Sequence, residues 1–335
     1  MRESNRDVID AALTWQRDGR RIVLATVIAT WGSAPRQQGA QMCIDDSGRF
    51  VGSVSGGCVE GAVIHHAREL MVDGGVRSLR FGVSDAEAWE VGLACGGTVE
   101  IWLHASPPAS LLERMAGHVG PLVLVSRLDS GEYDVVDPSE TDGETSIAAD
   151  LRDAALVALA DDRSTSLEHE GVRYFLHVRN RTVRVLIVGA THLAQSLTRM
   201  VRAAGFDVVV IDPRRDFNTE ERFPGVAREF AWPEEAIERC GIDERTAVVT
   251  TSHDPKLDDP SLRVALESSA FYIGALGSRR THEARTTRLL ELGFDPEDVS
   301  RIHAPIGLDI GSRSPGEIAA SVVAEIIQSL RQSSP

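Results

Sequence analysis

Several residue types are scarce in this chain of 335 residues, and each scarcity narrows the class of protein. Positive charge is in deficit: 35 basic residues face 50 acidic ones, and a net charge of −15 argues against a nucleic-acid partner or an anionic membrane surface. The four cysteines form no CxxC pair, which argues against a structural zinc site. No apolar run approaches the length of a membrane span, and the charged first residues do not resemble a signal peptide. We therefore expect a soluble, cytoplasmic protein with reduced thiols.

Lysine is the scarcest charged residue, since Lys256 is the single lysine among the 35 basic residues. Such a preference for arginine is typical of a GC-rich coding sequence, which makes the position of the surviving lysine worth noting. Lys256 belongs to the stretch Ser252–Asp259, which follows an expected strand. One interpretation is a ligand site at the carboxyl end of a parallel strand, formed by His253, Asp254 and Lys256. The other is chance survival of the lysine.

The hydrophobic pattern changes near residue 181, which indicates two domains. Residues 1–181 are expected to form a mixed α/β domain with a variable middle segment. In residues 182–335, short apolar strands alternate with helices of about ten to fifteen residues, which is typical of a Rossmann-like, doubly wound parallel sheet. The expected fold class is therefore α/β in both domains.

The same periodicities place individual elements. In the N-terminal domain the expected helices cover 6–18, 59–72 and 150–161, and the expected strands cover 21–30, 41–44, 49–54, 76–81 and 98–104. In the C-terminal domain the expected strands cover 183–188, 207–211, 246–251 and 270–274, and the expected helices cover 190–204, 261–268 and 281–292. A last helix is expected to begin at Ser314-Pro315-Gly316-Glu317, which reads as a capping box with proline at the first position.

The turn after the first C-terminal strand is similar to a dinucleotide-binding turn. It begins at Gly189, and Asp212 stands 23 residues later, a spacing that suits a carboxylate on a ribose hydroxyl and a phosphate at the helix N-terminus. The fingerprint is incomplete because Thr191 occupies the position of the second glycine, although its hydroxyl is able to hold a phosphate. NAD(P) or another nucleotide is one interpretation, and a Rossmann-like scaffold that binds no dinucleotide is the other.

A second anion site is expected where Gly277, Ser278 and Arg279 lead from a strand into a helix. Helix N-terminal amides and neighbouring guanidinium groups suit a phosphate, whereas the alternative is a turn with solvent-facing arginines. Because the chain is strongly acidic, the positive charge that an anionic ligand needs has to be local. The candidates are Arg36, Arg214, Arg279 and Arg280.

Two cysteines of the N-terminal domain are flanked by glycines, Cys58 after Gly56-Gly57 and Cys95 before Gly96-Gly97. The helix dipole favours the thiolate of a cysteine at a helix start, and glycine neighbours admit a large flat ligand. Burial as a small hydrophobic residue is the alternative for both. Cys43 and Cys240 are expected to be structural.

A strand-to-loop stretch, Trp31–Arg36, precedes these cysteines and offers the Ser33 hydroxyl and the Arg36 guanidinium to an anionic group. The sequence contains no Ser–His–Asp or HExxH signature, and no acid/base set for hydride transfer is recognisable.

Taken together, these motifs resemble those of the XdhC/CoxI family of accessory proteins for molybdenum hydroxylases. In the N-terminal domain the likeness runs through residues 25–27, 31–36, 52–60 and 95–97. In the C-terminal domain it runs through residues 211–214, 253–256, 272–278 and 304–311. It covers nearly the whole chain apart from the middle segment.

The resemblance implies a chaperone for the molybdenum cofactor (molybdopterin) rather than a metabolic enzyme. Such a protein binds the cofactor, supports its sulfuration by a cysteine desulfurase and helps to insert it into an apoenzyme of the xanthine or CO dehydrogenase type. Mapped onto this sequence, Cys58 contacts the molybdenum or the transferred sulfur, and Cys95 is a second thiol. The candidates for holding the cofactor's phosphate are Ser33, Arg36, Gly56 and Gly57. The resemblance also implies a homodimer.

Two enzymatic alternatives stand beside the chaperone. One is an NAD(P)-dependent oxidoreductase with its active site between the domains, and the other is a nucleotide-handling enzyme that uses His253, Asp254 and Lys256 on a phosphate. The family's first Rossmann turn usually has glycine at the position of Thr191, and this departure weakens the case for a bound nucleotide.

Overall fold

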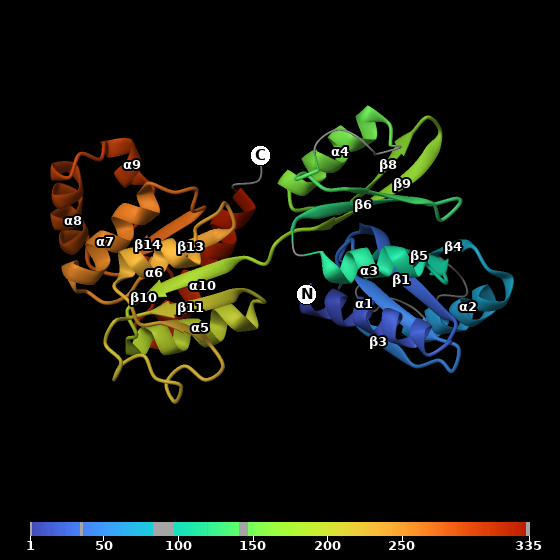
Figure 1. Ribbon diagram of the computed structural model, residues 1–335, viewed down its shortest axis with the longest axis horizontal. Coiled ribbons are helices and arrows are strands. Elements are labelled where there is room, and N and C mark those ends of the chain that lie inside the picture. Colours follow the sequence, from blue (N-terminus) through green and yellow to red (C-terminus); the bar gives the residue numbers. More distant parts are fainter. Residues whose placement is uncertain (1, 34–35, 83–96, 119, 141–146, 333–335) are drawn as a thin grey trace. The chain divides into compact units, whose positions relative to one another are not determined.

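The computed structural model describes residues 2–33, 36–82, 97–118, 120–140 and 147–332 (Figure 1). The chain divides into two compact units, Met1–Arg181 and Thr182–Pro335. No helix in the described ranges is both long and apolar enough to cross a membrane.

The N-terminal unit contains a five-stranded antiparallel sheet with the strand order β3-β2-β1-β5-β4. Its strands are β1 (Ile22–Trp31), β2 (Gln41–Asp45), β3 (Phe50–Gly52), β4 (Val76–Phe81) and β5 (Thr98–Ala105). Apolar residues alternate along β1, so that Val23 packs with α2 (Glu60–Asp73) and Leu24 packs with α1 (Arg2–Arg17) and α3 (Ala109–Gly117). Both faces of this sheet are therefore covered by helices.

A second antiparallel sheet of the same unit has the order β7-β6-β9-β8. Its elements are β6 (Leu122–Arg127), β7 (Tyr133–Val136), α4 (Ala149–Ala160), β8 (Thr165–His169) and β9 (Val172–Arg179). Helix α4 covers one face through Ala155 and Leu159. A small cluster that includes Ile28, Trp102 and Phe175 joins this sheet to the five-stranded one.

The C-terminal unit is built on a six-stranded parallel sheet with the order β12-β11-β10-β13-β14-β15. Its elements are β10 (Arg184–Val188), α5 (His192–Ala203), β11 (Asp207–Ile211), β12 (Ala227–Glu229), α6 (Pro233–Cys240), β13 (Thr246–Thr250), α7 (Pro255–Leu266), β14 (Tyr272–Ala275), α8 (Arg279–Glu291), α9 (Pro296–Ser300), β15 (Ile302–His303) and α10 (Pro315–Gln332). The strand order reverses at β10, between β11 and β13, and in Rossmann folds this is the position at which a nucleotide binds.

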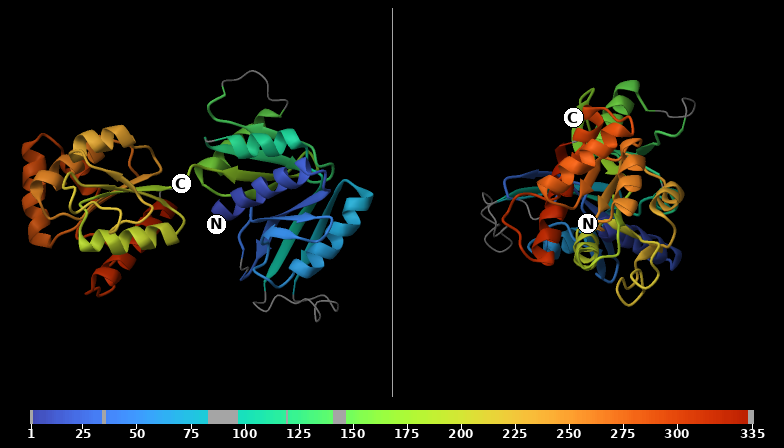
Figure 2. Two further views of the ribbon diagram at one scale, coloured as in Figure 1. Left: turned by 60° about the horizontal axis from the view of Figure 1, so that its bottom comes forward. Right: turned by 90° about the vertical axis from the view of Figure 1, so that its left-hand side faces the viewer.

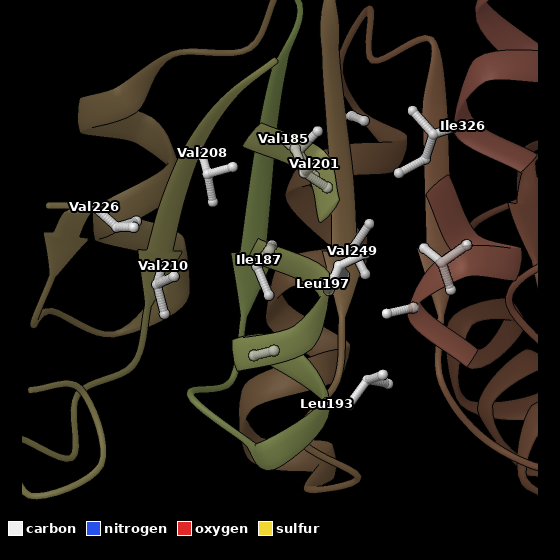
Figure 3. Packing of buried hydrophobic residues seen from close by; sticks show 14 of the residues in the cluster. Val185, Ile187, Leu193, Leu197, Val201, Val208, Val210, Val226, Val249 and Ile326 are labelled. Atoms are coloured by element: carbon white, nitrogen blue, oxygen red, sulfur yellow. The ribbon is translucent and has the colours of Figure 1, made fainter. Parts of the chain in front are cut away.

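Helices cover both faces of the parallel sheet (Figure 2). Val185 and Ile187 of β10 face α5 and α10, where they pack with Leu197 and Ile326 (Figure 3). The intervening Leu186 and Val188 of β10 face α6, α7 and α8. This alternation buries every residue from Val185 to Val188 and explains why the strand reads as a continuous apolar run.

The structure confirms the expected α/β class and the Rossmann-like parallel sheet. The expected capping box is also confirmed, because the Ser314 amide donates to Glu317 Oε2 (2.9 Å) and the Glu317 amide donates to Ser314 Oγ (3.3 Å). Helix α7 begins at Pro255 rather than at residue 261, since Pro260 is accommodated inside the helix instead of marking its start. The short elements β12, α6, α9 and β15 were not expected from periodicity, which needs longer segments to be visible.

A partly buried carboxylate, that of Glu325, anchors the loop that follows β15. The hydroxyl of Tyr272 donates to Glu325 Oε2 (2.5 Å), the Gly307 amide donates to the same oxygen (2.8 Å), and His303 Nδ1 lies 3.3 Å from Glu325 Oε1. Burial favours the neutral form of Glu325, but the hydrogen bonds from His303, Tyr272 and Gly307 prevail and hold the pKa of this carboxyl below its usual value. Helix α10 is thereby tied to two neighbouring strand ends.

Replacement of the Glu325 carboxylate tests whether it anchors α10 to the neighbouring strand ends. Glu325→Ala leaves the hydroxyl of Tyr272, which is 1% exposed, and the Gly307 amide without an acceptor, so the free energy of unfolding is expected to fall by about 1–3 kcal/mol. Urea denaturation followed by circular dichroism measures the change. Glu291→Ala on the exposed side of α8 serves as the control and is expected to change stability by less than about 0.5 kcal/mol. Equal effects in the two variants would contradict the anchoring role.

Candidate functional site

The candidate residues of the N-terminal unit lie in loops at one edge of the five-stranded sheet, where its strands end. Strand β1 ends at Trp31, which pairs with Thr98 at the start of β5. Strand β3 ends at Gly52, which pairs with Met42 near the start of β2. The loops that carry Ser33, Arg36 and Cys58 therefore leave the sheet at the same edge.

The loop Ser53–Gly57 is folded around the carboxylate of Glu60, the first residue of α2. Glu60 Oε1 accepts hydrogen bonds from Ser53 Oγ (2.6 Å) and from the amides of Val54 (3.2 Å), Ser55 (2.9 Å) and Gly56 (3.2 Å). Glu60 Oε2 accepts hydrogen bonds from Ser55 Oγ and from the Gly57 amide (2.9 Å). The side chain thus fixes the whole loop that leads to Cys58.

The electrostatics of Glu60 follow from these contacts. The residue is 7% exposed, and burial alone would raise the pKa of its carboxyl. The hydrogen bonds from Ser53, Ser55 and the backbone outweigh burial and lower this pKa from 4.5 to about 2. Glu60 is therefore ionised at neutral pH, and its charge sits at the N-terminus of α2, where the helix dipole stabilises it.

Two glycines give this loop its shape. Gly56 has φ of 82° and Gly57 has φ of 121°, conformations that side chains disfavour. A Cβ added to Gly57 would meet nothing within 4 Å, so the space beside it is open. Both amides are already engaged by Glu60, and the glycines contribute to the site through their missing side chains rather than as free amide donors.

Cys58 is half-buried between this loop and α2, where it packs against the apolar cluster beneath the sheet face. Val59 separates it from the first helical residue, so the thiol stands at the entrance of the helix, as the sequence predicted. The open space beside Gly57 therefore adjoins the residue that carries the thiol. Cys95, the second glycine-flanked cysteine, lies outside the described residues.

Arg36 connects the two loops of this edge. Its Nε donates to the backbone carbonyl of Ser53 (3.2 Å), and its Nη2 is buried without an acceptor in the part of the chain that the structure describes. Ser33 is exposed, and its carbonyl oxygen lies only 2.6 Å from the place where a Cβ on Gly97 would be. Gly97 therefore lets the start of β5 pass directly beside Ser33. Ser33, Arg36 and the Cys58 loop form one neighbourhood, which we call the thiol edge.

Two features of the thiol edge were missed from the sequence. Glu60 lies within a recognised motif, but no role had been assigned to it, although an acid just after two glycines at a helix start is a signal for a carboxylate that accepts backbone amides. The exposed ring of Trp31 was also missed, and the guanidinium carbon of Arg80 lies 4.7 Å from its centroid.

In the C-terminal unit, the residues of the dinucleotide-type turn contact one another and the loop after β13. Thr191 caps α5 by accepting a hydrogen bond from the Ala194 amide (3.2 Å), and its hydroxyl lies 3.2 Å from that of Thr251. A Cβ on Gly189 would lie 2.8 Å from Ser252 Cβ, so the loop after β13 fills the space beside this glycine. These contacts engage the Thr191 hydroxyl and place the loop after β13 against Gly189, at the turn where a Rossmann fold usually seats a pyrophosphate.

The acid expected to bind a ribose is also committed internally. Asp212 is fully buried, and Arg214 donates from Nε to Oδ1 (2.9 Å) and from Nη2 to Oδ2 (2.7 Å). The amide of Ala190 donates to Oδ2 (2.7 Å), and the amide of Arg214 donates to Oδ1 (2.9 Å). Burial opposes ionisation, but these donors hold the pKa of Asp212 below its usual value. Arg214 consequently neutralises Asp212 and is not a free anion receptor.

The loop after β13 is a helix start rather than a cluster of catalytic side chains. Asp254 caps α7 by accepting a hydrogen bond from the Lys256 amide (3.0 Å). The Lys256 side chain is exposed, and its ammonium makes no ion pair with a described residue. His253 is exposed and has φ of 59°, a strained conformation for a residue with a Cβ. Ser278 likewise caps α8, followed by the exposed Arg279.

Comparisons with known proteins decide the family. The model of the family described as "XdhC and CoxI family" matches residues 15–82, and the model described as "XdhC Rossmann domain" matches residues 185–326. A molybdenum cofactor insertion chaperone of Escherichia coli, PaoD, is 30% identical over 97% of this chain and 88% of its own length. The chain belongs to the XdhC and CoxI family.

Two further relatives extend over both units. A protein of Bacillus subtilis described as a probable xanthine dehydrogenase subunit is 29% identical over 97% of this chain and 97% of its own length. A crystal structure described as a xanthine dehydrogenase from Bacillus halodurans superposes with a TM-score of 0.75 and 26% identity over 97% of this chain and 96% of the other.

The pKa of Glu60 predicts how the thiol edge responds to acid. Because the folded-state pKa of about 2 lies below the ordinary 4.5, Glu60 stabilises the fold fully above pH 4.5 and loses this contribution as the pH falls toward 2. Glu60→Gln is therefore expected to lower the free energy of unfolding by about 1–3 kcal/mol at pH 7, and the deficit should shrink below pH 4.5.

Urea titrations at pH 7 and in the acid range measure this difference. Glu69→Gln is the control on the same helix, because Glu69 is 46% exposed and solvent screens its ion pair with Arg77. A deficit for Glu60→Gln that does not change with pH would contradict the ionised carboxylate.

The internal contacts of the turn after β10 predict that no dinucleotide binds at this turn. In calorimetric titrations with NAD⁺ and NADP⁺, any saturable heat is expected to be the same in Arg214→Ala as in the parent protein, because Thr191, Asp212 and Ser252 already contact one another or their neighbours at this turn. Saturable micromolar binding that Arg214→Ala abolishes would show that the Asp212–Arg214 pair opens for a ribose phosphate, and would overturn this prediction.

Proposed function

We propose that this protein binds the molybdenum cofactor at the thiol edge, supports its sulfuration and delivers it to a molybdenum hydroxylase of the xanthine or CO dehydrogenase type. The observation that carries the proposal is the half-buried thiol of Cys58, held at a helix entrance by a loop fixed on Glu60. The lack of a side chain at Gly57, beside which no described atom lies within 4 Å of a Cβ position, favours the approach of a ligand to this loop.

The residues of the thiol edge suit such a cargo. No group of three or more His, Cys, Asp or Glu side chains among the described residues is arranged to hold a metal ion. Molybdenum in this cofactor arrives with its own dithiolene sulfur ligands, so the carrier needs only one soft ligand of its own. The sulfur of Cys58 supplies this ligand.

The cofactor also carries a phosphate, which needs donors at a distance from the metal. Arg36 offers a buried Nη2 that lacks an acceptor in the described parts of the chain, and the exposed Ser33 adds a hydroxyl. The Gly56 and Gly57 amides are tied to Glu60 and are left out of this role. We assign the phosphate to Arg36 and Ser33 and the molybdenum or its exchanged sulfur to Cys58, with Cys95 as a second thiol.

The partners follow from the cargo. A carrier that hands over a sulfurated cofactor needs a cysteine desulfurase as the sulfur donor and a molybdenum hydroxylase apoenzyme as the recipient. The names of the Escherichia coli and Bacillus subtilis relatives support the recipient class. We further propose that the protein works in the cytoplasm as a homodimer. In this scheme the protein is a carrier, and no described constellation requires it to be an oxidoreductase.

Removal of the thiol tests the proposal. Under anaerobic conditions the purified protein is expected to bind molybdenum cofactor stoichiometrically, and Cys58→Ala should bind it about tenfold more weakly or worse, because the metal loses its protein ligand. Mass spectrometry of the released pterin and elemental analysis for molybdenum measure the load. Cys240→Ala is the matched control, since this thiol is also partly exposed but lies in the C-terminal unit.

The two variants separate the outcomes. Normal loading of Cys240→Ala together with an empty Cys58→Ala supports the thiol role, provided that both variants melt like the parent protein. Unchanged affinity in Cys58→Ala would sink it. Failure of the parent protein to retain any molybdopterin would sink the carrier function itself.

A further inference from the structure

A buried guanidinium with free donors lies behind the N-terminus of α8. Arg285 is 2% exposed, and its Nη2 donates to the carbonyl of Leu276 (3.2 Å), two residues before the N-cap Ser278. Side chains on a helix point toward its N-terminus, so the guanidinium is directed to the turn Gly277–Arg280. Its Nε and Nη1 are buried and have no acceptor within the described chain.

The neighbouring carboxylate does not satisfy this guanidinium. Asp258 of α7 is also 2% exposed, but its Oδ2 lies 3.5 Å from Arg285 Nη2, and its Oδ1 accepts a hydrogen bond from Ser252 Oγ (2.6 Å). The ion pair offsets the charge of Arg285, but most of the N–H groups of Arg285 still lack an oxygen. A buried donor of a charged group that lacks an acceptor is destabilising, and an incoming anion would relieve this.

A second unpartnered donor or acceptor occurs one turn away. His282 of α8 precedes Arg285 by three residues, which places both side chains on the same face of the helix, and its Nδ1 is buried without a partner among the described residues. Burial, and then the charge of Arg285, lower the pKa of His282, so a neutral imidazole faces this position. Arg279 and Arg280 stand exposed at the same turn and add positive charge.

Helices α5 and α7 differ from α8 in this respect. Thr191 caps α5 in the same way as Ser278 caps α8, but at α5 the loop at Ser252 packs against Gly189. The N-terminus of α7 carries the carboxylate of Asp254 as its cap, which is a like charge for an anion. At α8 the cap is a neutral hydroxyl, and an arginine with open donors lies behind it.

We propose that the turn Gly277–Arg280 and the Arg285 guanidinium form a binding site for a phosphate-bearing ligand, either a bare diphosphate or the diphosphate of a nucleotide. Helix N-terminal amides and several guanidinium groups together suit a multiply charged phosphate better than a single carboxylate. The site lies at the carboxyl edge of the sheet, where open α/β folds bind ligands, and moves the expected anion position from α5 to α8. The inference does not depend on the cofactor bound at the thiol edge.

Calorimetric titration of the full chain with inorganic pyrophosphate, ADP, CDP and GDP tests this site. Saturable binding is expected, with affinity reduced about tenfold or more in Arg285→Lys, which keeps the charge but loses the planar fork. The exposed double variant R279Q/R280Q is expected to bind several-fold more weakly without loss of stability. Thr191→Ala at α5 is the matched control and should bind like the parent protein.

The outcomes divide cleanly. Tighter binding of a nucleotide than of pyrophosphate identifies a nucleotide ligand, and equal binding identifies a bare diphosphate; both support the site. No saturable binding by the parent protein overturns it and leaves buried water as the partner of Arg285. Loss of binding in Thr191→Ala with normal binding in Arg285→Lys also overturns it. If Arg285→Lys does not fold, unchanged affinity in R279Q/R280Q overturns the site.

Discussion

The carboxylate of Glu60 is the constraint on which the thiol edge depends. One side chain accepts hydrogen bonds from two serine hydroxyls and a run of successive backbone amides, so the loop Ser53–Gly57 has no freedom to adopt another path. The glycines with positive φ are needed because the amides have to converge on a single charge. Cys58 follows this loop directly. The hydrogen bonds that the loop donates to Glu60 therefore also fix the position of Cys58 at the entrance of α2.

In the Rossmann-like unit, similar hydrogen bonds engage the usual ligand position instead of shaping a candidate site. There, Asp212, Asp254 and the Thr191 hydroxyl satisfy helix starts and amides that a nucleotide would otherwise bind. A sheet with the strand order of a dinucleotide-binding fold has thus become internally saturated at its usual ligand position. The fold is retained because its two apolar faces remain buried by helices on both sides, which needs no ligand.

Much of this was predictable from the sequence because it depends on local pattern. The continuous apolar run of β10, the capping box at Ser314 and the thiol at the start of α2 follow from periodicity and capping preferences within a few residues. The saturation of Asp212 was not predictable, because its bidentate pairing with Arg214 depends on a side-chain rotamer that a spacing does not specify. Arg285 was also missed, since on a polar helix it reads as a solvent-facing residue until packing buries it.

Because the chain has an excess of acidic residues, a guanidinium nitrogen that lacks an acceptor is informative. With acids in excess, most partly buried guanidinium groups contact an oxygen: Arg127 Nε lies 2.8 Å from Asp129 Oδ1, and the terminal nitrogens of Arg127, Arg184 and Arg228 donate to carboxylates, carbonyls or a hydroxyl. Among the described residues, a terminal guanidinium nitrogen is buried without an acceptor in Arg36 and in Arg285 alone. One lies in each unit, and each stands beside a loop that opens a helix. In a protein with a net charge of −15, donors that could have paired with a surplus carboxylate but did not are best explained by anions that arrive from outside the chain.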